Sequence, residues 1–182
     1  AESDDSIYQI EAHYLPEDKM TSLKRWLVNF NEELDLSTKT HLSANYYRVS
    51  DKDYFKDIAQ TNTNVKTLKS NLKLTYDDEE NHLSSSLLTE NEQVVNAGVP
   101  VYTRELEGSI SKTFNVDKKM PIQVDLVRTN FAHDTASKET GIRTHGDLGV
   151  SRKLNTKFPV ITPRASVAIT NYSLKNSSNI NR

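Results

Sequence analysis

Hydrophobic and polar residues alternate along residues 65–76, where Leu72 and Leu74 fall on one parity and Lys69 and Lys73 on the other. A period of two predicts a β-strand with one apolar and one polar face. The pattern returns in runs of roughly ten to thirteen residues, close to the length that a tilted strand needs to cross a bilayer. About nine strands are predicted, with no helix between them. They cover residues 7–15, 24–34, 38–48, 64–76, 82–92, 101–113, 120–132, 141–154 and 160–173.

Parity also divides the side chains of each strand between two faces. If a bilayer is present, the charged parity must turn away from lipid, because an exposed Arg or Lys at mid-bilayer costs roughly 2–4 kcal/mol. We therefore expect a lipid-facing set of Leu68, Leu72, Leu74, Ile122, Val124, Leu126, Leu148, Val150, Val167 and Ile169. We expect an interior, lumen-facing set of Asp125, Arg143, His145, Lys153 and Arg164.

Two all-β architectures share this alternation. One is an antiparallel up-and-down meander that forms an arc of a large transmembrane β-barrel. The other is a soluble periplasmic or secreted β-sandwich that binds lipid or glycan, with one face of each sheet in its core. Periodicity alone leaves the two nearly even. Long strands, a charge-rich polar face and only 5 glycines for tight corners favour the barrel.

Composition changes this picture little. The chain is 35% hydrophobic with a mean hydropathy of −0.67, which gives no apolar run long enough for a spanning helix. The lack of a long apolar run does not argue against a barrel, because only every second residue of a barrel strand faces lipid. A formal charge of −2 provides no basic footprint for nucleic acid. Cysteine is absent, which excludes disulfides and thiolate metal sites within these residues.

Catalytic and metal sites find little support. The five histidines are scattered, with no pair at metal-ligand spacing. The acidic run at residues 77–80 lacks the spaced ligands and the glycine of a calcium loop, so it indicates a solvated hairpin tip. No phosphate-binding loop and no nucleophile elbow is present. We expect no enzyme, no metal and no cofactor, with a hydrolase carried on a barrel as the third-ranked class.

Four segments carry a resemblance to a known family. Residues 10–19, 24–27 and 44–57 are similar to the barrel domain of LptD, the lipopolysaccharide-assembly protein also called organic solvent tolerance protein. The segment with Val49-Ser50-Asp51 and Tyr54-Phe55 is the most specific part. Residues 139–148, followed by the turn with Pro159, resemble a later family segment. There Gly146 and Asp147 stand where the family has an acidic residue and proline.

The resemblance implies an outer-membrane protein of Gram-negative bacteria that inserts lipopolysaccharide into the outer leaflet without covalent chemistry. It implies that residues 1–182 are part of a barrel of about two dozen strands, without the family's N-terminal jelly roll and without the closing strands. The implied partners are lipopolysaccharide, the lipoprotein LptE inside the lumen, periplasmic bridge proteins that act through the jelly roll, and the barrel-insertion machinery.

Overall fold

The computed structural model describes residues 7–19, 21–59, 64–117, 120–154 and 161–175, and all nine predicted strands are found there. Their bounds are β1 Ile7–Leu15, β2 Arg25–Ser37, β3 Thr40–Val49, β4 Thr67–Asp78, β5 Leu83–Val94, β6 Thr103–Asp117, β7 Met120–Ala132, β8 Gly141–Ser151 and β9 Arg164–Leu174. The bounds of β1 and β7 agree with the prediction, and the others differ by a few residues at one or both ends. Pro159, which belongs to the resemblance, lies outside the described residues.

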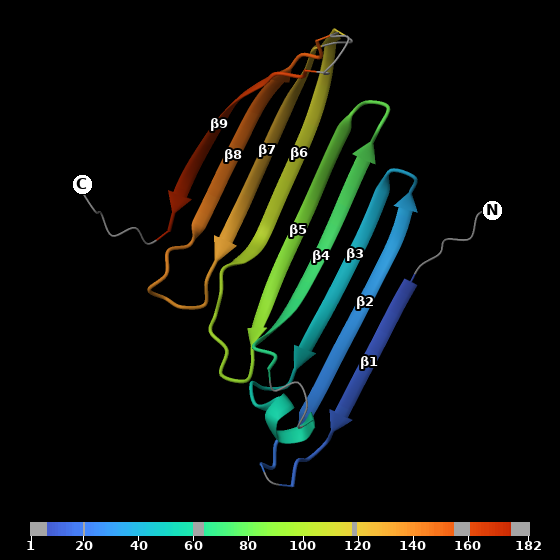
Figure 1. Cartoon of the computed structure of the whole chain (residues 1–182). Helices are drawn as coiled ribbons and strands as arrows, with labels where there is room; N and C mark the ends of the chain where they lie inside the picture. The colour runs from blue at the N-terminus through green and yellow to red at the C-terminus, as the bar shows by residue number, and fades with distance from the viewer. Residues whose placement is uncertain (1–6, 20, 60–63, 118–119, 155–160, 176–182) are drawn as a thin grey trace, which may run out of the picture.

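The strands form one sheet in the order in which they follow along the chain, and every neighbouring pair is antiparallel. The predicted up-and-down meander is therefore confirmed. No second sheet packs on it within the described residues, so the structure does not show the sandwich that alternation alone left open. Figure 1 shows β1 and β9 at opposite edges, where each pairs with a single neighbour.

The hairpins step in one direction across the sheet. β3 begins opposite Tyr76, although β4 continues to Asp78. β5 begins opposite Lys112, although β6 continues to Asp117. The hairpin tips consequently rise from β2–β3 to β6–β7 along the upper margin of Figure 1. A regular stagger of this kind accompanies the strand tilt of a barrel wall.

Three of the four connections at one end of the strands are short, and the fourth, at residues 152–163, is longer. Thr38 and Lys39 connect β2 to β3, and residues 79–82 connect β4 to β5. The other end carries the connections at residues 16–24, 50–66, 95–102 and 133–140, which we call the long-loop end. The connection at 50–66 holds one helical element that alternation does not predict, the short π-helix η1 at Phe55–Ala59.

A small hydrophobic core lies at the long-loop end beneath η1. It is one cluster of buried side chains: Leu27, Val49, Tyr54, Phe55, Leu68 and Val95. The rings of Tyr54 and Phe55 pack edge to face with centroids 5.5 Å apart, a favourable arrangement for aromatic pairs. The core thus fastens the longest connection to the sheet and leaves most of the sheet's two faces uncovered.

The β3–β4 ladder stops short of this core, and its last pair is Asn45 with Asn71. Beyond this pair, two side chains supply the hydrogen bonds to the β3 backbone. The Tyr47 N–H donates to the Ser70 hydroxyl at 3.1 Å, and the amide of Gln93 bonds both the N–H and the carbonyl of Val49. Backbone groups that lose their partner in the ladder are satisfied by side chains instead. β4 can therefore diverge from β3 and bring Leu68 into the core.

Candidate functional site

One face of the sheet carries a continuous set of apolar side chains, most of them exposed and the rest half-buried. The register opposes Leu126 to Ile110 and Gly146, and Leu148 to Val124 and Val167. Their neighbours on the same face belong to all nine strands. This apolar face comprises Tyr8, Ile10, Tyr14, Val28, Phe30, Tyr46, Leu72, Leu74, Leu87, Leu106, Ile110, Phe114, Ile122, Val124, Leu126, Leu148, Val150, Val167 and Ile169.

Nine of the ten residues expected to face lipid lie on this face without being buried. Leu148 is 54% exposed and Ile169 is 70% exposed. Leu68 has the same parity but is only 1% exposed, because the divergence of β4 turns it into the core. Its surroundings are protein, so alternation alone misplaces this one side chain.

The apolar face becomes polar toward the long-loop end. There Ser70 pairs with Asn91, and Arg128 pairs with Thr144. Arg48, on the same face, is the penultimate residue of β3. Nearer the other end, Lys112 extends to the carbonyl of Asn81 in a turn. Glu32 of β2 also belongs to this face, opposite Tyr8 and Ala44. Of these charges, Arg48 lies next to the end of its strand, whereas Glu32 and Lys112 each lie five residues from the end of theirs.

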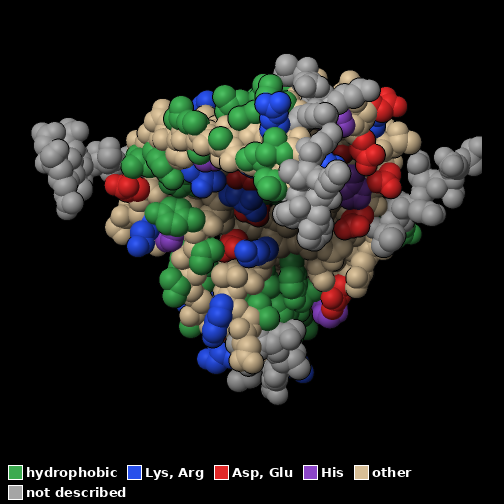
Figure 2. Space-filling model, turned by 45° about the horizontal axis from the view of Figure 1, so that its top comes forward, with side chains coloured by type: hydrophobic (Ala, Val, Ile, Leu, Met, Phe, Trp, Pro, Cys, Tyr) green, Lys and Arg blue, Asp and Glu red, His purple; other side chains and the backbone are tan. Residues whose placement is uncertain are grey.

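The opposite, polar face carries a hydrogen-bonded charge network. Arg104 donates to both carboxylate oxygens of Glu90, at 2.6 and 2.8 Å, and to Glu107 at 2.9 Å. The Thr129 hydroxyl donates to Glu107 at 2.7 Å, and Thr129 is only 4% exposed. In Figure 2, charged side chains line the central hollow, while hydrophobic side chains gather along the upper left margin.

Four of the five residues expected to face the lumen lie on the polar face. Asp125 opposes Asp147, Arg143 opposes Tyr172, and Arg164 opposes Ser151. His145 hydrogen-bonds Thr170 across the β8–β9 pair at 2.7 Å. Lys153, the fifth residue, lies beyond the end of β8 at Ser151, where the ladder assigns it to neither face.

A cavity of about 330 Å³ opens on the polar face across β6, β7, β8 and the edge strand β9. Aromatic and cationic side chains line it together, and one of them is the expected lumen residue Arg143. The lining comprises Tyr102, Thr103, Arg104, Thr129, Phe131, Arg143 and Tyr172. Aromatic rings beside guanidinium groups suit ligands that carry both sugar and phosphate.

The motif residues of the N-terminal segments converge on one buried arginine. Arg25 is 2% exposed and lies within ion-pairing distance of three carboxylates: Asp51 at 2.7 Å, Asp57 at 2.9 Å and Asp18 at 3.4 Å. Asp18 belongs to the β1–β2 loop, and the other two to the β3–β4 connection. Beside them, burial raises the pKa of the Tyr54 hydroxyl. Arg25 thereby ties two long loops to the start of β2.

The described residues offer no group of three or more His, Asp or Glu side chains that could hold a metal ion. None of the helices in the described part of the chain is long and apolar enough to cross a membrane. The arrangement that the described residues form consists of two contrasting surfaces, one apolar and one charged.

A single staggered meander sheet with an exposed apolar face and a charged opposite face defines an arc of a transmembrane β-barrel. The family model described as LptD, LPS transport system D, matches residues 23–181, and the chain belongs to this family. A search of curated proteins finds no match. Membership implies a part in lipopolysaccharide transport at the outer membrane of Gram-negative bacteria, and the family is a transport component, not a known enzyme family.

Proposed function

We propose that the chain is an internal arc of the wall of the outer-membrane translocon that inserts lipopolysaccharide into the outer leaflet. The observation that carries the proposal is the continuous apolar face across nine strands. Such a face is stable against hydrocarbon, whereas large exposed apolar patches are rare on proteins in water. Within the described residues, β1 and β9 each have one unpaired edge, which further strands of a larger barrel would complete.

In this arrangement the polar face lines the lumen. Its charged groups suit the sugar and phosphate part of lipopolysaccharide, and the acyl chains remain with apolar surface. The cavity beside Arg104 and Arg143 offers both rings and cations to such a molecule. The same face provides hydrogen-bonding groups for a lipoprotein plug of the LptE type. The unpaired edges offer pairing sites to the barrel-insertion machinery during assembly.

The long-loop end would face the cell exterior. Barrels of bacterial outer membranes have short periplasmic turns and longer extracellular loops. The connections at residues 38–39 and 79–82 would then face the periplasm, together with the longer connection at residues 152–163.

Spin labels on adjacent residues test the assignment of the faces. The chain has no cysteine, so each introduced cysteine is the sole labelling site. Ile169→Cys and Thr170→Cys form a matched pair, because they are neighbours on opposite faces of β9. In a bilayer, the label at 169 should be accessible to oxygen and shielded from a water-soluble nickel chelate, and the label at 170 should show the reverse. Equal access to the chelate at both positions would contradict the proposal and favour a soluble module.

Photo-crosslinking tests the proposed partners separately. A benzophenone side chain at His145 should capture lipopolysaccharide or the plug lipoprotein in cells, because His145 lies on the polar face. The same group at Val167, on the apolar face of the neighbouring strand, is the control. Capture of the lipoprotein from Val167 and not from His145 would reverse the two faces.

A further inference from the structure

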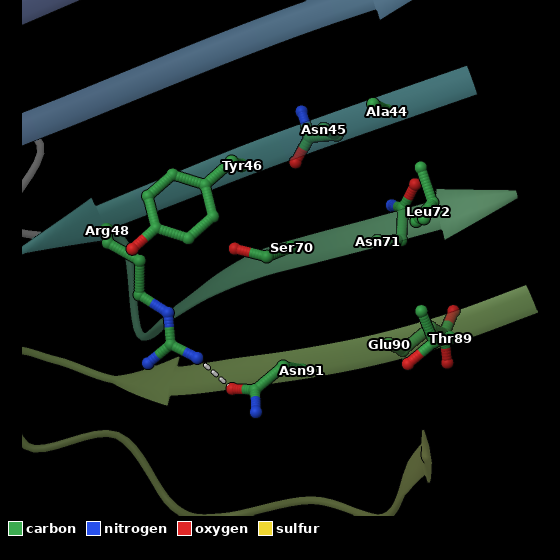
Figure 3. A pocket seen from close by; sticks show the side chains of 10 residues that line it. All are labelled: Ala44, Asn45, Tyr46, Arg48, Ser70, Asn71, Leu72, Thr89, Glu90 and Asn91. Carbon is green, nitrogen blue, oxygen red and sulfur yellow. Dashed lines mark hydrogen bonds between the residues drawn. The ribbon is translucent and has the colours of Figure 1, made fainter. Parts of the chain in front are cut away.

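The apolar face contains one depression with a cation in it. It measures about 410 Å³ and lies where the β3–β4 ladder ends. Figure 3 shows the side chain of Arg48 extending from β3 across β4 toward Asn91 of β5. Arg48 donates a hydrogen bond to the side-chain oxygen of Asn91. Among the described residues no other group bonds this guanidinium, so its remaining N–H groups can bind a ligand in the depression.

Arg48 differs from Arg25 and Arg104 in having no carboxylate partner among the described residues, a property that it shares with Arg128 on the same face. Arg25 has three carboxylates around it, and Arg104 has two. Within the described part of the chain, no carboxylate comes within ion-pairing distance of Arg48. Glu90 lines the same depression, but Arg104 binds both of its carboxylate oxygens on the opposite face. Arg48 therefore presents an unneutralised positive charge on the apolar face.

The lining of the depression is amphipathic. Ala44, Tyr46 and Leu72 supply apolar surface that continues into the apolar face, while Ser70 and Asn91 supply polar atoms next to Arg48. The Ser70 hydroxyl is already engaged by the backbone of Tyr47, so Arg48 and the Asn91 amide are the principal donors. A ligand for this site needs an anionic head and an apolar body.

The position along the strand agrees with such a ligand. Arg48 lies at the long-loop end, in the region where the apolar face becomes polar. Tyr14 and Trp26 oppose each other on the same face at this end, as expected for aromatic residues at a membrane–water interface. An arginine is costly at mid-bilayer and cheap at this depth, where lipid phosphates lie.

We infer that Arg48 and Asn91 form a docking site for the phosphate of an anionic membrane lipid whose acyl chains lie along Leu72 and Leu74. Guanidinium groups bind phosphate oxygens through paired N–H donors, and basic residues near a bilayer surface select anionic lipids. The inference rests on the proposed function, since it requires the apolar face to contact lipid. It adds a lipid site on the outer surface of the wall, away from the lumen.

Trp26 provides a local reporter, because it is the only tryptophan of the chain and lies two residues from Val28, the cross-strand neighbour of Arg48. The protein is reconstituted in phosphatidylcholine with phosphatidylglycerol or phosphatidylcholine brominated near the carbonyl end of the acyl chains. Quenching of Trp26 by the two brominated lipids gives their relative binding constant. We expect a preference of about five-fold for phosphatidylglycerol. High salt should reduce this preference by screening the charges. Inorganic phosphate should reduce it no more than another salt of the same ionic strength does.

Arg48→Gln should lower the preference to about one. Arg128→Gln is the matched control, since it removes an arginine from the same face and the same end of distant β7 and should leave Trp26 quenching unchanged. Equal quenching by both lipids in the unaltered protein, or a preference that survives in Arg48→Gln, would overturn the inference. Loss of the preference to inorganic phosphate would mean that free phosphate is the ligand. Absence of quenching by either lipid would overturn the proposed function itself.

Discussion

Gln93 of β5 hydrogen-bonds the backbone of Val49 in β3 with both ends of its side-chain amide, although β4 lies between these strands in the sheet. The Val49 N–H donates to Oε1 at 3.0 Å, and Nε2 donates to the Val49 carbonyl at 2.8 Å. One side chain thereby replaces two ladder bonds at the point where β4 diverges. The buried core and the Arg48 depression both depend on this divergence.

Replacing Gln93 by Leu should lower the free energy of unfolding by about 2 kcal/mol, because the N–H and the carbonyl of buried Val49 lose their partners. Urea titration of the protein in bilayers measures the change. Gln9→Leu is the control, since Gln9 is exposed on β1. A loss of similar size in both variants would mean that the Gln93 bonds contribute nothing specific.

Arg25→Met should cost about 3 kcal/mol, because three carboxylates lose a cation that is itself buried. Arg25→Lys should restore the stability only in part, since one ammonium cannot reproduce the forked contacts to Asp51 and Asp57. Limited proteolysis should then cut the connection at residues 50–66 faster. Arg164→Met serves as the control, because the one contact of Arg164 to Gln123 is long, at 3.5 Å.

Two leucines of β4 differ in environment, so truncating each one compares the stability contribution of the protein core with that of the apolar face. The variants are Leu68→Ala and Leu72→Ala. Leu68 lies in the core, so its truncation should cost about 2–5 kcal/mol. Leu72 is 46% exposed on the apolar face, and its truncation should cost about 1 kcal/mol or less, because acyl chains can fill the space. Urea titration of both variants under the same conditions gives the comparison. Equal losses would show that the two leucines share one environment.

Ile169→Arg and Thr170→Arg place the same charge on opposite faces of β9. The arginine at 169 should cost about 2–4 kcal/mol in a bilayer, and the one at 170 should be nearly neutral, because it faces water. Folding yield into vesicles, measured by the shift of the unheated band on a denaturing gel, ranks the two. The reverse ranking would mean that the apolar face points away from lipid.

The Glu90–Arg104 pair should show a measurable coupling energy on the polar face. A double-mutant cycle with Glu90→Gln and Arg104→Gln should give about 1 kcal/mol, because the contact is bidentate and partly covered. The matched cycle on Lys69 and Glu92, joined by one contact of 3.2 Å to an exposed ammonium, should give less than about 0.5 kcal/mol. Equal couplings would remove the distinction between the two pairs.

Alternation predicted the strands and the division of their side chains between two faces of the sheet, because the side-chain period of an extended strand depends on backbone geometry alone. Which face meets lipid stays a prediction. It could not predict the burial of Leu68, which follows from the divergence of β4 and so from contacts of Ser70 and Gln93 with another strand. It also missed η1, since five residues are too few to show a helical period.

In the sequence, the residues of the Arg25 cluster are recognisable only as separate positions within the segments that resemble the family. Asp18, Asp51 and Asp57 lie in two different loops, and the strand pairing alone brings them to Arg25. Charge and spacing gave no sign of that convergence. The resemblance marked the right residues without showing what they do, and the distances supply the reason.

The unpaired edges of β1 and β9 affect whether the protein reaches its folded barrel or aggregates. β9 is exposed along its whole length, and its outer backbone groups have no partner strand within the described residues. Whatever extended chain arrives there first, whether a neighbour within the same wall or a stray copy, is held by the same backbone bonds. Timing of arrival would therefore decide between a finished cylinder and an aggregate.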